Sequence, residues 1–483
     1  MRQRRSEISI YVLAAVSVLV IAAASALGLG AARFVQGAGG SIGYAVHQYD
    51  GGITHTYTIN ADIKPMNISV GGAIYGTPTI YNGVMYATTM GRLKDLQDSR
   101  YDLTKGQVVA IDMQTGKIVW NDMFPNQIMT QPIIAGGLVI VGMSNNGEVP
   151  SQYYNLAQAM IGINATTGKV VWEYPNHARS PTGPDLVTPA YYKGLIIEPG
   201  MGTVEIYNAS TGALVRSVNT GLPDILSSPL LVNGTAYFGA GYGTAYGYNS
   251  FSYNISGVRM NITSDERLFA LDPATGHILW DTRFVNAGEG LNDVSPAWAN
   301  GIVVAAYLYQ SDYTDPWMMA VNSTNGQILW QLNETKYIKE HGLVTPYAID
   351  GVFLNYTQNT ISPITIVNGT AYLNSNYIGF LMAVNISRGE IMWATPTGQN
   401  EGNPNVFLGH YLLTVSDGGL LFVINSTNGD IVNVTNIGMP HLASQPIITD
   451  NYAILSGMDG RIVTLPLQAL IKPNRSLLGS GGV

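Results

Sequence analysis

The sequence predicts an all-β protein: one eight-bladed β-propeller, closed by an N-terminal strand and preceded by an N-terminal signal or transmembrane helix. Two recurring phrases lead to this prediction. The first is an apolar strand, Asp or Asn, a Thr/Ser-Gly turn and a second apolar strand ending in Trp, as in "LFALDPATGHILW" (268–280). The second is a polar residue beside Pro, followed by two short apolar strands around a tight turn, as in "SSPLLVNGTAYFG" (227–239). Together they give four strands per repeat of about 40 to 65 residues, which is typical of propeller blades.

Copies of the first phrase count the blades. Complete units end near Trp120, Trp172, Val215, Trp280, Trp330, Trp393 and Val434. An eighth unit begins at Ser444 and lacks its outermost strand. The alternating segment "ITHTYTINADI" (53–63) is our predicted source of that strand, because closing the ring removes exposed sheet edges.

The turn of the first phrase has a structural explanation. We expect Asp272 and Asn322 to accept hydrogen bonds from backbone amides of the turn, and Gly276 and Gly326 to supply its positive φ angle. The Trp residues that end the phrases are expected to pack between neighbouring blades. These residues therefore hold the ring together and are not candidates for chemistry.

Composition limits the function further. Only 11% of the 483 residues are charged, well below the quarter that is usual in soluble proteins. Apart from codon or lineage bias, one physical reason for this depletion is an acidic milieu, because protonated carboxyl groups cannot balance a large number of Lys and Arg residues. The formal net charge of −8 has no basic stripe beside it, which argues against a nucleic-acid partner.

The absence of cysteine excludes disulfides, thiolate metal sites and a Cys nucleophile.

The N-terminus predicts export. "MRQRR" precedes an uncharged apolar run of about 25 residues, long enough to span a bilayer with the following chain outside. An uncleaved anchor and a cleaved signal both remain open, so the protein is expected to be extracytoplasmic, either membrane-anchored or secreted. The predicted organisation is a signal or anchor (1–33), a Gly-rich tether (34–52), the propeller (53–466) and a C-terminal tail (467–483).

Asn-x-Ser/Thr triplets are consistent with export and predict a glycoprotein. Several occupy expected turns of the repeat, where a glycan would be tolerated. The triplets begin at Asn67, Asn164, Asn208, Asn233, Asn254, Asn261, Asn322, Asn333, Asn355, Asn368, Asn385, Asn425, Asn433 and Asn474.

Scarce ionisable residues gather in the connections that lead into the innermost strands. In a propeller these connections surround one opening of the central funnel. Arg179 and Lys339 would suit a small dianion there, and a carboxyl group made less acidic by burial can act as general acid or base. The candidate substrate-binding residues are Arg179, Lys339, His341, Glu401 and His441. The alternative interpretation is that each is an ordinary solvated loop residue.

The phrase "ALDPATGHILW" and its copies resemble the pyrroloquinoline-quinone-like repeat family over about residues 55 to 466. This family includes quinoprotein dehydrogenases, a bacterial outer-membrane assembly lipoprotein and the tetrathionate hydrolases of acidophiles. The alcohol dehydrogenases carry adjacent cysteines over the quinone and the lipoprotein needs an acylated Cys, whereas this chain has none. In length, export and architecture the chain is most similar to the tetrathionate hydrolases.

The resemblance implies an enzyme that hydrolyses tetrathionate or a related inorganic sulfur anion at acidic pH, with no cofactor or metal. It also implies an aspartate as acid or base, which is expected to be Asp293, or else Asp312 or Asp315 in "YQSDYTDPW". Two other functions stay open: a non-catalytic surface scaffold that binds a protein partner, and a quinone-dependent dehydrogenase. A homo-oligomer is also possible, because insertions 90–106 and 240–267 suit either a funnel cover or a subunit contact.

Overall fold

The computed structural model describes most of the repeat region. The described residues are 59, 63–95, 100–102, 105–144, 158–175, 187–200, 202–222, 227–241, 252–255, 258–261, 266–284, 287–289, 295–309, 315–344, 348–349, 352–353, 363–375, 378–398, 405–416, 418–439, 441–442 and 444–471. The predicted N-terminal helix (1–33) and tether (34–52) lie outside them. In the part of the chain that is described, no helix is long and apolar enough to cross a bilayer.

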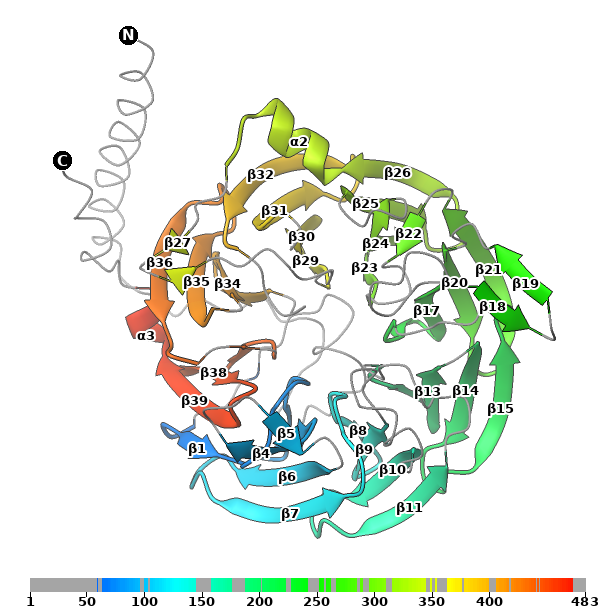
Figure 1. The fold of residues 1–483 in the computed structure, drawn as a ribbon, viewed down its shortest axis with the longest axis vertical. Helices are drawn as coiled ribbons and strands as arrows, with labels where there is room; N and C mark the ends of the chain where they lie inside the picture. Colours follow the sequence, from blue (N-terminus) through cyan, green and yellow to red (C-terminus); the bar gives the residue numbers. More distant parts are fainter. Residues whose placement is uncertain are drawn as a thin grey trace. The chain divides into compact units, whose positions relative to one another are not determined.

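Eight antiparallel sheets follow one another around a ring, which confirms the predicted all-β, eight-bladed propeller (Figure 1). We number the sheets in chain order and give their strands from the innermost to the outermost. Sheet 1 consists of β2 (Thr79–Tyr81), β3 (Val84–Thr89), β6 (Gly106–Asp112) and β7 (Ile118–Phe124), and sheet 2 of β8 (Ile133–Ala135), β9 (Leu138–Met143), β10 (Ala159–Asn164) and β11 (Val170–Pro175). Sheet 3 consists of β12 (Ala190–Tyr192), β13 (Leu195–Pro199), β14 (Thr203–Asn208) and β15 (Leu214–Asn219), and sheet 4 of β16 (Leu230–Val232), β17 (Thr235–Ala240), β20 (Glu266–Asp272) and β21 (His277–Phe284).

Sheets 5 to 8 complete the ring. Sheet 5 consists of β23 (Ala297–Ala299), β24 (Ile302–Tyr309), β25 (Asp315–Asn322) and β26 (Ile328–Asn333), and sheet 6 of β29 (Thr365–Val367), β30 (Thr370–Ser375), β31 (Phe380–Asn385) and β32 (Glu390–Pro396). Sheet 7 consists of β33 (Val406–Leu408), β34 (Tyr411–Val415), β35 (Leu420–Asn425) and β36 (Ile431–Asn436), and sheet 8 of β37 (Ile447–Ile448), β38 (Tyr452–Ser456), β39 (Arg461–Pro466) and β1 (Asn67–Ser69).

The N-terminal strand that closes sheet 8 is β1, not the segment 53–63. β1 pairs antiparallel with β39, with Asn67 opposite Val463. The two described residues of the predicted segment, Ile59 and Ile63, lie outside the strands and are buried in an apolar cluster. The N–H of Ile59 donates to the carbonyl of Ile448 in β37 at 2.8 Å. Ile59 and Ile63 of the alternating segment therefore pack between sheets 8 and 1, and the strand that completes sheet 8 comes after them in the chain.

The core lies between the sheets. One buried cluster joins Tyr86 and Val108 of sheet 1 to Val141 and Ile161 of sheet 2, and equivalent clusters occupy other seams. The second and third strands of sheets 1 to 7 are mostly buried where their burial is described, because both their faces meet a neighbouring sheet, which explains their continuous apolar sequences. In sheet 8 the third strand, β39, is mostly half-buried. Removing apolar surface from water in these seams is the main stabilising contribution to the ring.

The turn chemistry predicted from the repeat is confirmed. Asp272 Oδ1 accepts from the N–H of Ala274 at 2.9 Å, and its other oxygen accepts from the Thr275 hydroxyl at 2.7 Å. These bonds to the ionised form, the Thr275 hydroxyl first, hold the pKa of Asp272 below its ordinary value. Gly276 completes the turn with a φ of 78°.

Each described Trp that ends a phrase packs on the next sheet, as expected. The indole Nε1 of Trp120 donates to the carbonyl of Ala165 at 3.0 Å. A Cβ at Gly168 would lie 2.8 Å from Trp120 Cδ2, so glycine is needed there for close approach as well as for its φ of 75°. The same donor bonds join Trp172 to Ala209, Trp280 to Ser323, Trp330 to Ile386 and Trp393 to Ser426.

Sheets 3, 7 and 8 lack the Trp, and sheets 3 and 7 use other side chains at the same place in the ladder. In sheet 3, Arg216 lies opposite Ile206, and its Nη1 donates to the carbonyls of Pro273 and Ala274 in sheet 4 at 3.0 and 2.9 Å. In sheet 7, the Nδ2 of Asn433 donates at 2.9 Å to the carbonyl of Leu470, the last residue of the short helix α3 (Leu467–Leu470).

Candidate functional site

The two ends of every sheet are connected differently. The first-to-second and third-to-fourth strand turns meet at one end, which we call the turn end. The second-to-third links and the links to the next sheet meet at the other, which we call the connection end, because the strands alternate in direction. Apart from α3, which follows β39 at the turn end, the extra described elements lie in links of the connection end. They are β4 (Arg92–Asp95), β5 (Arg100–Asp102), β18 (Ser252–Ile255), β19 (Val258–Asn261), β22 (Ala287–Glu289), α2 (Glu334–Glu340), β27 (Ala348–Ile349) and β28 (Val352–Phe353). Elaborated loops on a rigid scaffold commonly carry function, so this end is the candidate functional face.

The residues predicted for the site all belong to links of the connection end. Arg179, Asp293, Asp312 and Glu401 lie outside the described residues, and the structure gives only the strands on either side of them. Asp312 lies between β24 and β25, and Asp293 lies between β22 and β23. Asp315 is the first residue of β25. Lys339, His341 and His441 are described in full.

Sheet 5 supplies the described strands that flank the three aspartates in the chain. β24 and β25 each have eight residues, and the additional strand β22 pairs with the far end of β24. In this extension Ala287 lies opposite Tyr309, which in turn lies opposite Asp315. The link bearing Asp293 runs between two strands that both pair with β24, and the link bearing Asp312 joins β24 to β25. The sequence analysis did not foresee β22 (Ala287–Glu289), which pairs with the end of β24 and precedes the link that holds Asp293.

Lys339 and His341 lie on the outer part of the connection end. α2 follows β26, the outermost strand of sheet 5, and lies at the periphery of the ring (Figure 1). Asn333 begins the helix by accepting from the N–H of Lys336 at 2.7 Å, and Ile338 packs with Phe380 of sheet 6. His341 is exposed and stacks on Tyr337 with ring centroids 4.0 Å apart. The structure therefore places Lys339 and His341 beside the outermost strand of sheet 5 and not at an innermost strand. Their role in substrate binding stays a prediction.

His441 lies where the sequence places it, in the link from sheet 7 to the innermost strand of sheet 8. It is exposed and has a φ of 56°, and its carbonyl accepts from the N–H of Met458 at 3.0 Å. That bond fixes the link against the second-to-third turn of sheet 8. His441 remains a candidate ligand for an anion at this end.

A belt of polar residues joins the innermost strands at the connection end. In sheets 2 and 3 the residue before Pro donates its backbone N–H to a side-chain hydroxyl of the next sheet. Gln131 donates to the Thr188 hydroxyl at 3.0 Å, and Thr188 donates to the Ser228 hydroxyl at 2.9 Å. The N–H of Gln445 donates to Thr77 at 3.0 Å and so closes the ring from sheet 8 to sheet 1. The belt, which we call the inner belt, consists of Thr77, Thr79, Gln131, Thr188, Ser228, Ser295, Thr365, Asn405 and Gln445.

The inner belt explains the polar residue beside Pro in the second phrase. Proline removes a donor from the start of the innermost strand, and the polar residue before or after it bonds to the neighbouring sheet instead. The belt residues are buried, so they are structural in the first instance. Within the described part of the chain, the Nδ2 of Asn405 is a buried donor without a hydrogen-bond partner.

Two glutamates in sheet 3 form a site that the sequence analysis missed. Glu198 in β13 lies directly opposite Glu205 in β14, one pair from the connection end. Glu198 is 0% exposed and Glu205 is 8% exposed, and the Tyr207 hydroxyl donates to the Glu205 carboxylate. The equivalent pair in sheet 4 is Phe238 and Phe269. A glutamate inside the apolar runs "LIIEP" and "VEIY" was the available sequence signal. Among the described residues, no three His, Asp or Glu side chains gather into a metal site.

The fold, the Trp contacts and the closed ring define an eight-bladed propeller with pyrroloquinoline-quinone-like repeats. The profile of the family described as outer membrane protein assembly factor BamB matches residues 76–255 and 249–436, and the chain belongs to this family. The family relationship establishes the repeat and the architecture of the chain.

Proteins similar to this chain include two tetrathionate hydrolases and a BamB of known structure. The tetrathionate hydrolase of Acidianus ambivalens is 27% identical over 441 residues, which cover 83% of this chain and 74% of that protein. The tetrathionate hydrolase of Acidithiobacillus ferrooxidans is 23% identical over 421 residues, covering 81% and 72%. The crystal structure of BamB from Moraxella catarrhalis superimposes with a TM-score of 0.55 at 16% identity, covering 84% of this chain and 100% of that one. The last similarity concerns the fold alone.

Proposed function

We propose that this protein is an extracytoplasmic hydrolase that cleaves tetrathionate or a related sulfur oxoanion at acidic pH. The observation that carries the proposal is the extension of sheet 5, in which β22 pairs with β24 and β24 pairs with β25 up to Asp315. The proposal assigns the chemistry to Asp293, Asp312 or Asp315, because the segments that hold the first two begin or end at these strands. The similarity to two tetrathionate hydrolases over most of the chain supports it. Residues 1–33 would carry the chain across the membrane, as an anchor or as a signal.

The reaction needs a group that handles protons at low pH. In the proposed step, water bonds through its oxygen to an inner sulfur of tetrathionate, and the central S–S bond breaks. The electron pair leaves with thiosulfate, and the aspartate takes the proton from the attacking water. An aspartate, with an ordinary pKa of about 3.9, is ionised and can accept this proton at about pH 4 to 6, where an imidazole is already largely protonated. To act as the base at pH 2, the aspartate would need a folded-state pKa below that ordinary value.

The dianion would be held by positive charge at the same end of the ring. His441, in the link to sheet 8, and Arg179, in the link to sheet 3, are the basic candidates nearest to innermost strands in the chain order. Glu401 would position water or a cationic side chain beside them. Lys339 and His341 would act farther out, where positive charge attracts an approaching anion.

The test is thiosulfate release from tetrathionate by the full chain at pH 2 and at pH 7. Asp293→Asn, Asp312→Asn and Asp315→Asn are assayed beside it, because Asn keeps the shape and cannot exchange a proton. Loss of the catalytic aspartate is expected to lower kcat about 100- to 10,000-fold, while the other two variants retain most activity. Release of no thiosulfate or sulfur at either pH, by a folded chain, rejects the proposal.

A second candidate is a non-catalytic surface scaffold. It is favoured by aliphatic residues exposed on the outermost strands of successive sheets: Val119 is 52% exposed, Val171 53% and Leu279 54%. Exposed apolar surface of this kind can contact a protein partner. Under this alternative the three aspartate variants bind the partner like the native chain and there is no turnover to lose. A quinone-dependent dehydrogenase would instead reduce a dye when quinone and calcium are added.

A further inference from the structure

Two Asn-x-Thr triplets form the tips of turns at the turn end of the ring. Asn233, Gly234 and Thr235 join β16 to β17, and the triplet of Asn368 joins β29 to β30 in the same way. Asn233 and Asn368 are both exposed and have φ angles of 50° and 51°. Each Asn therefore is an exposed residue of a two-residue hairpin turn.

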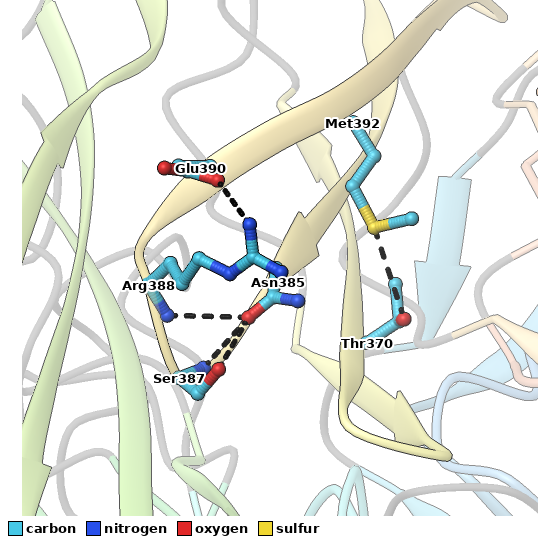
Figure 2. Close-up of polar contacts among 6 residues, drawn as sticks. All are labelled: Thr370, Asn385, Ser387, Arg388, Glu390 and Met392. Carbon is cyan, nitrogen blue, oxygen red and sulfur yellow. Dashed lines mark hydrogen bonds and ion pairs between the residues drawn. The ribbon is translucent and has the colours of Figure 1, made fainter.

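The triplets in the third-to-fourth strand turns are held differently. Asn385 Oδ1 accepts from the N–H of Ser387 at 3.0 Å, from its hydroxyl at 2.7 Å and from the N–H of Arg388 at 3.2 Å, as Figure 2 shows. The carbonyl of the middle residue, Ile386, accepts from Trp330 of the previous sheet. The triplet is thus fixed both within its own turn and across a seam. The same arrangement of the Asn oxygen recurs at Asn164, Asn208, Asn322 and Asn425.

The remaining described triplets are also engaged. Asn433 is buried and uses its Nδ2, the atom that a glycan would need, to bind Leu470. Asn333 caps α2, and Asn67, although exposed, lies in the ladder between β1 and β39. The side chains of the other four triplet asparagines lie outside the described residues.

We propose that Asn233 and Asn368 are N-glycosylation sites of the folded chain, preferred over the other triplets in the described residues. In the transfer, the Nδ2 of the asparagine loses one proton to a base of the transferase and bonds to the anomeric carbon of a sugar. The bond from that carbon to the phosphate of a lipid-linked oligosaccharide donor breaks, and the lipid phosphate leaves with the electron pair. The hydroxyl of Thr235 or Thr370 supplies the third position that the transferase recognises.

This placement has a functional consequence. The turn end is opposite the connection end, so the glycans would cover the face that carries the short turns and leave the links of Asp293 and Asp312 open. The proposal depends on export of the chain and not on which reaction the connection end performs. Glycosylation and tetrathionate hydrolysis can therefore fail separately.

The chain contains matched controls for the proposal. Asn82 and Asn300 occupy the same turn in sheets 1 and 5, with φ angles of 50° and 53°. Their third positions are Val84 and Ile302, which have no hydroxyl group. These asparagines have the same backbone as the proposed sites and lack only the acceptor triplet.

The experiment presents the full folded chain, and separately its protease-derived peptides, to a purified oligosaccharyltransferase with its lipid-linked donor. Mass spectrometry then reads occupancy at each asparagine. In the folded chain, occupancy at Asn233 and Asn368 is expected to exceed that at Asn164 and Asn385 by about tenfold or more, because the locked turns must first open. In the peptides this preference is expected to disappear.

Two kinds of variant sharpen the result. Thr235→Ala and Thr370→Ala should each remove the glycan from the preceding site alone, and Ile302→Thr should add one at Asn300. The proposal is overturned if the folded chain is modified equally at Asn385. It is also overturned if Asn233 and Asn368 stay unmodified in the folded chain while their peptides are modified.

Discussion

The Arg216 side chain lies directly against Gly276 across the seam between sheets 3 and 4, so closely that a Cβ on Gly276 would be 2.3 Å from Arg216 Cδ. In sheets 1, 2, 4, 5 and 6 a Trp has the equivalent relationship with a turn glycine of the next sheet. The stem of Arg216 therefore replaces the ring as packing surface, and its guanidinium replaces the indole as donor.

This relationship predicts that Arg216→Ala destabilises the ring by about 1 to 3 kcal/mol, because two carbonyl groups lose a charged donor and the turn loses its packing partner. Urea unfolding of the purified chain measures the effect. Arg216→Trp is the matched variant, and we expect it to be more stable than Arg216→Ala because it restores the contact of the other sheets. Equal stability of Arg216→Ala and the native chain would contradict the assigned role.

The Trp contacts should separate into packing and hydrogen bonding. Trp393→Phe keeps most of the ring and loses the bond to Ser426, so we expect a loss of about 1 kcal/mol, in addition to a packing defect. Trp393→Ala should lose about 3 to 5 kcal/mol, because Trp393 is only 8% exposed and the seam would contain a cavity. The control is Gly429→Ala, whose new Cβ would lie 2.7 Å from Trp393 Cε3 and should destabilise the same seam. The interpretation is refuted if the urea midpoint of Trp393→Ala is not lower than that of Trp393→Phe.

The strand-ending Asp residues predict a dependence on pH. Hydrogen bonds from Thr275 to Asp272 and from Thr115 to Asp112 hold the pKa of both carboxyl groups below their ordinary value. Because a lowered folded-state pKa stabilises only while the group is ionised, this contribution is present above the unfolded value of about 3.9 and is lost as the pH falls through the folded value.

Asp272→Asn and Asp112→Asn should therefore unfold at midpoints that change less between pH 5 and pH 2 than those of the native chain. Asn already provides the same acceptor, without a titratable charge, in the equivalent turns at Asn322 and Asn425. Thermal unfolding followed over this pH range measures the difference. A double variant that loses stability in acid as steeply as the native chain would show that these turns do not contribute.

The hydroxyl of Tyr207 should stabilise sheet 3 through Glu205. Tyr207→Phe leaves a carboxylate oxygen without its donor in a seam where Glu205 is 8% exposed, and we expect a loss of about 1 to 3 kcal/mol. Tyr174, which contacts Tyr207 edge to face at 5.1 Å between ring centroids, provides the control variant Tyr174→Phe. The two variants compared in urea unfolding distinguish loss of the bond from a general effect of removing a hydroxyl group.

The candidate site was predictable only in part. Sequence order alone places Asp293 and Asp312 in links that lead to or within sheet 5, because the repeat fixes which residues are strands. It could not show β22, whose three residues carry no repeat phrase and pair with the part of β24 that extends beyond the short strand β23. Lys339 and His341 also looked like funnel residues in the sequence, but a capped helix holds them at the end of the outermost strand.

The sequence by itself determined the number of blades, the turn chemistry and the Trp contacts, because each depends on residues within one repeat or on the same place in the next. Only the tertiary structure decided which segment closes the ring and how the inner belt forms. The bond from Gln131 to Thr188 joins residues 57 positions apart, and the bond from Gln445 to Thr77 joins residues 368 apart. Local patterns report which side of a strand is buried, but a partner at such separation is fixed only when the whole ring closes.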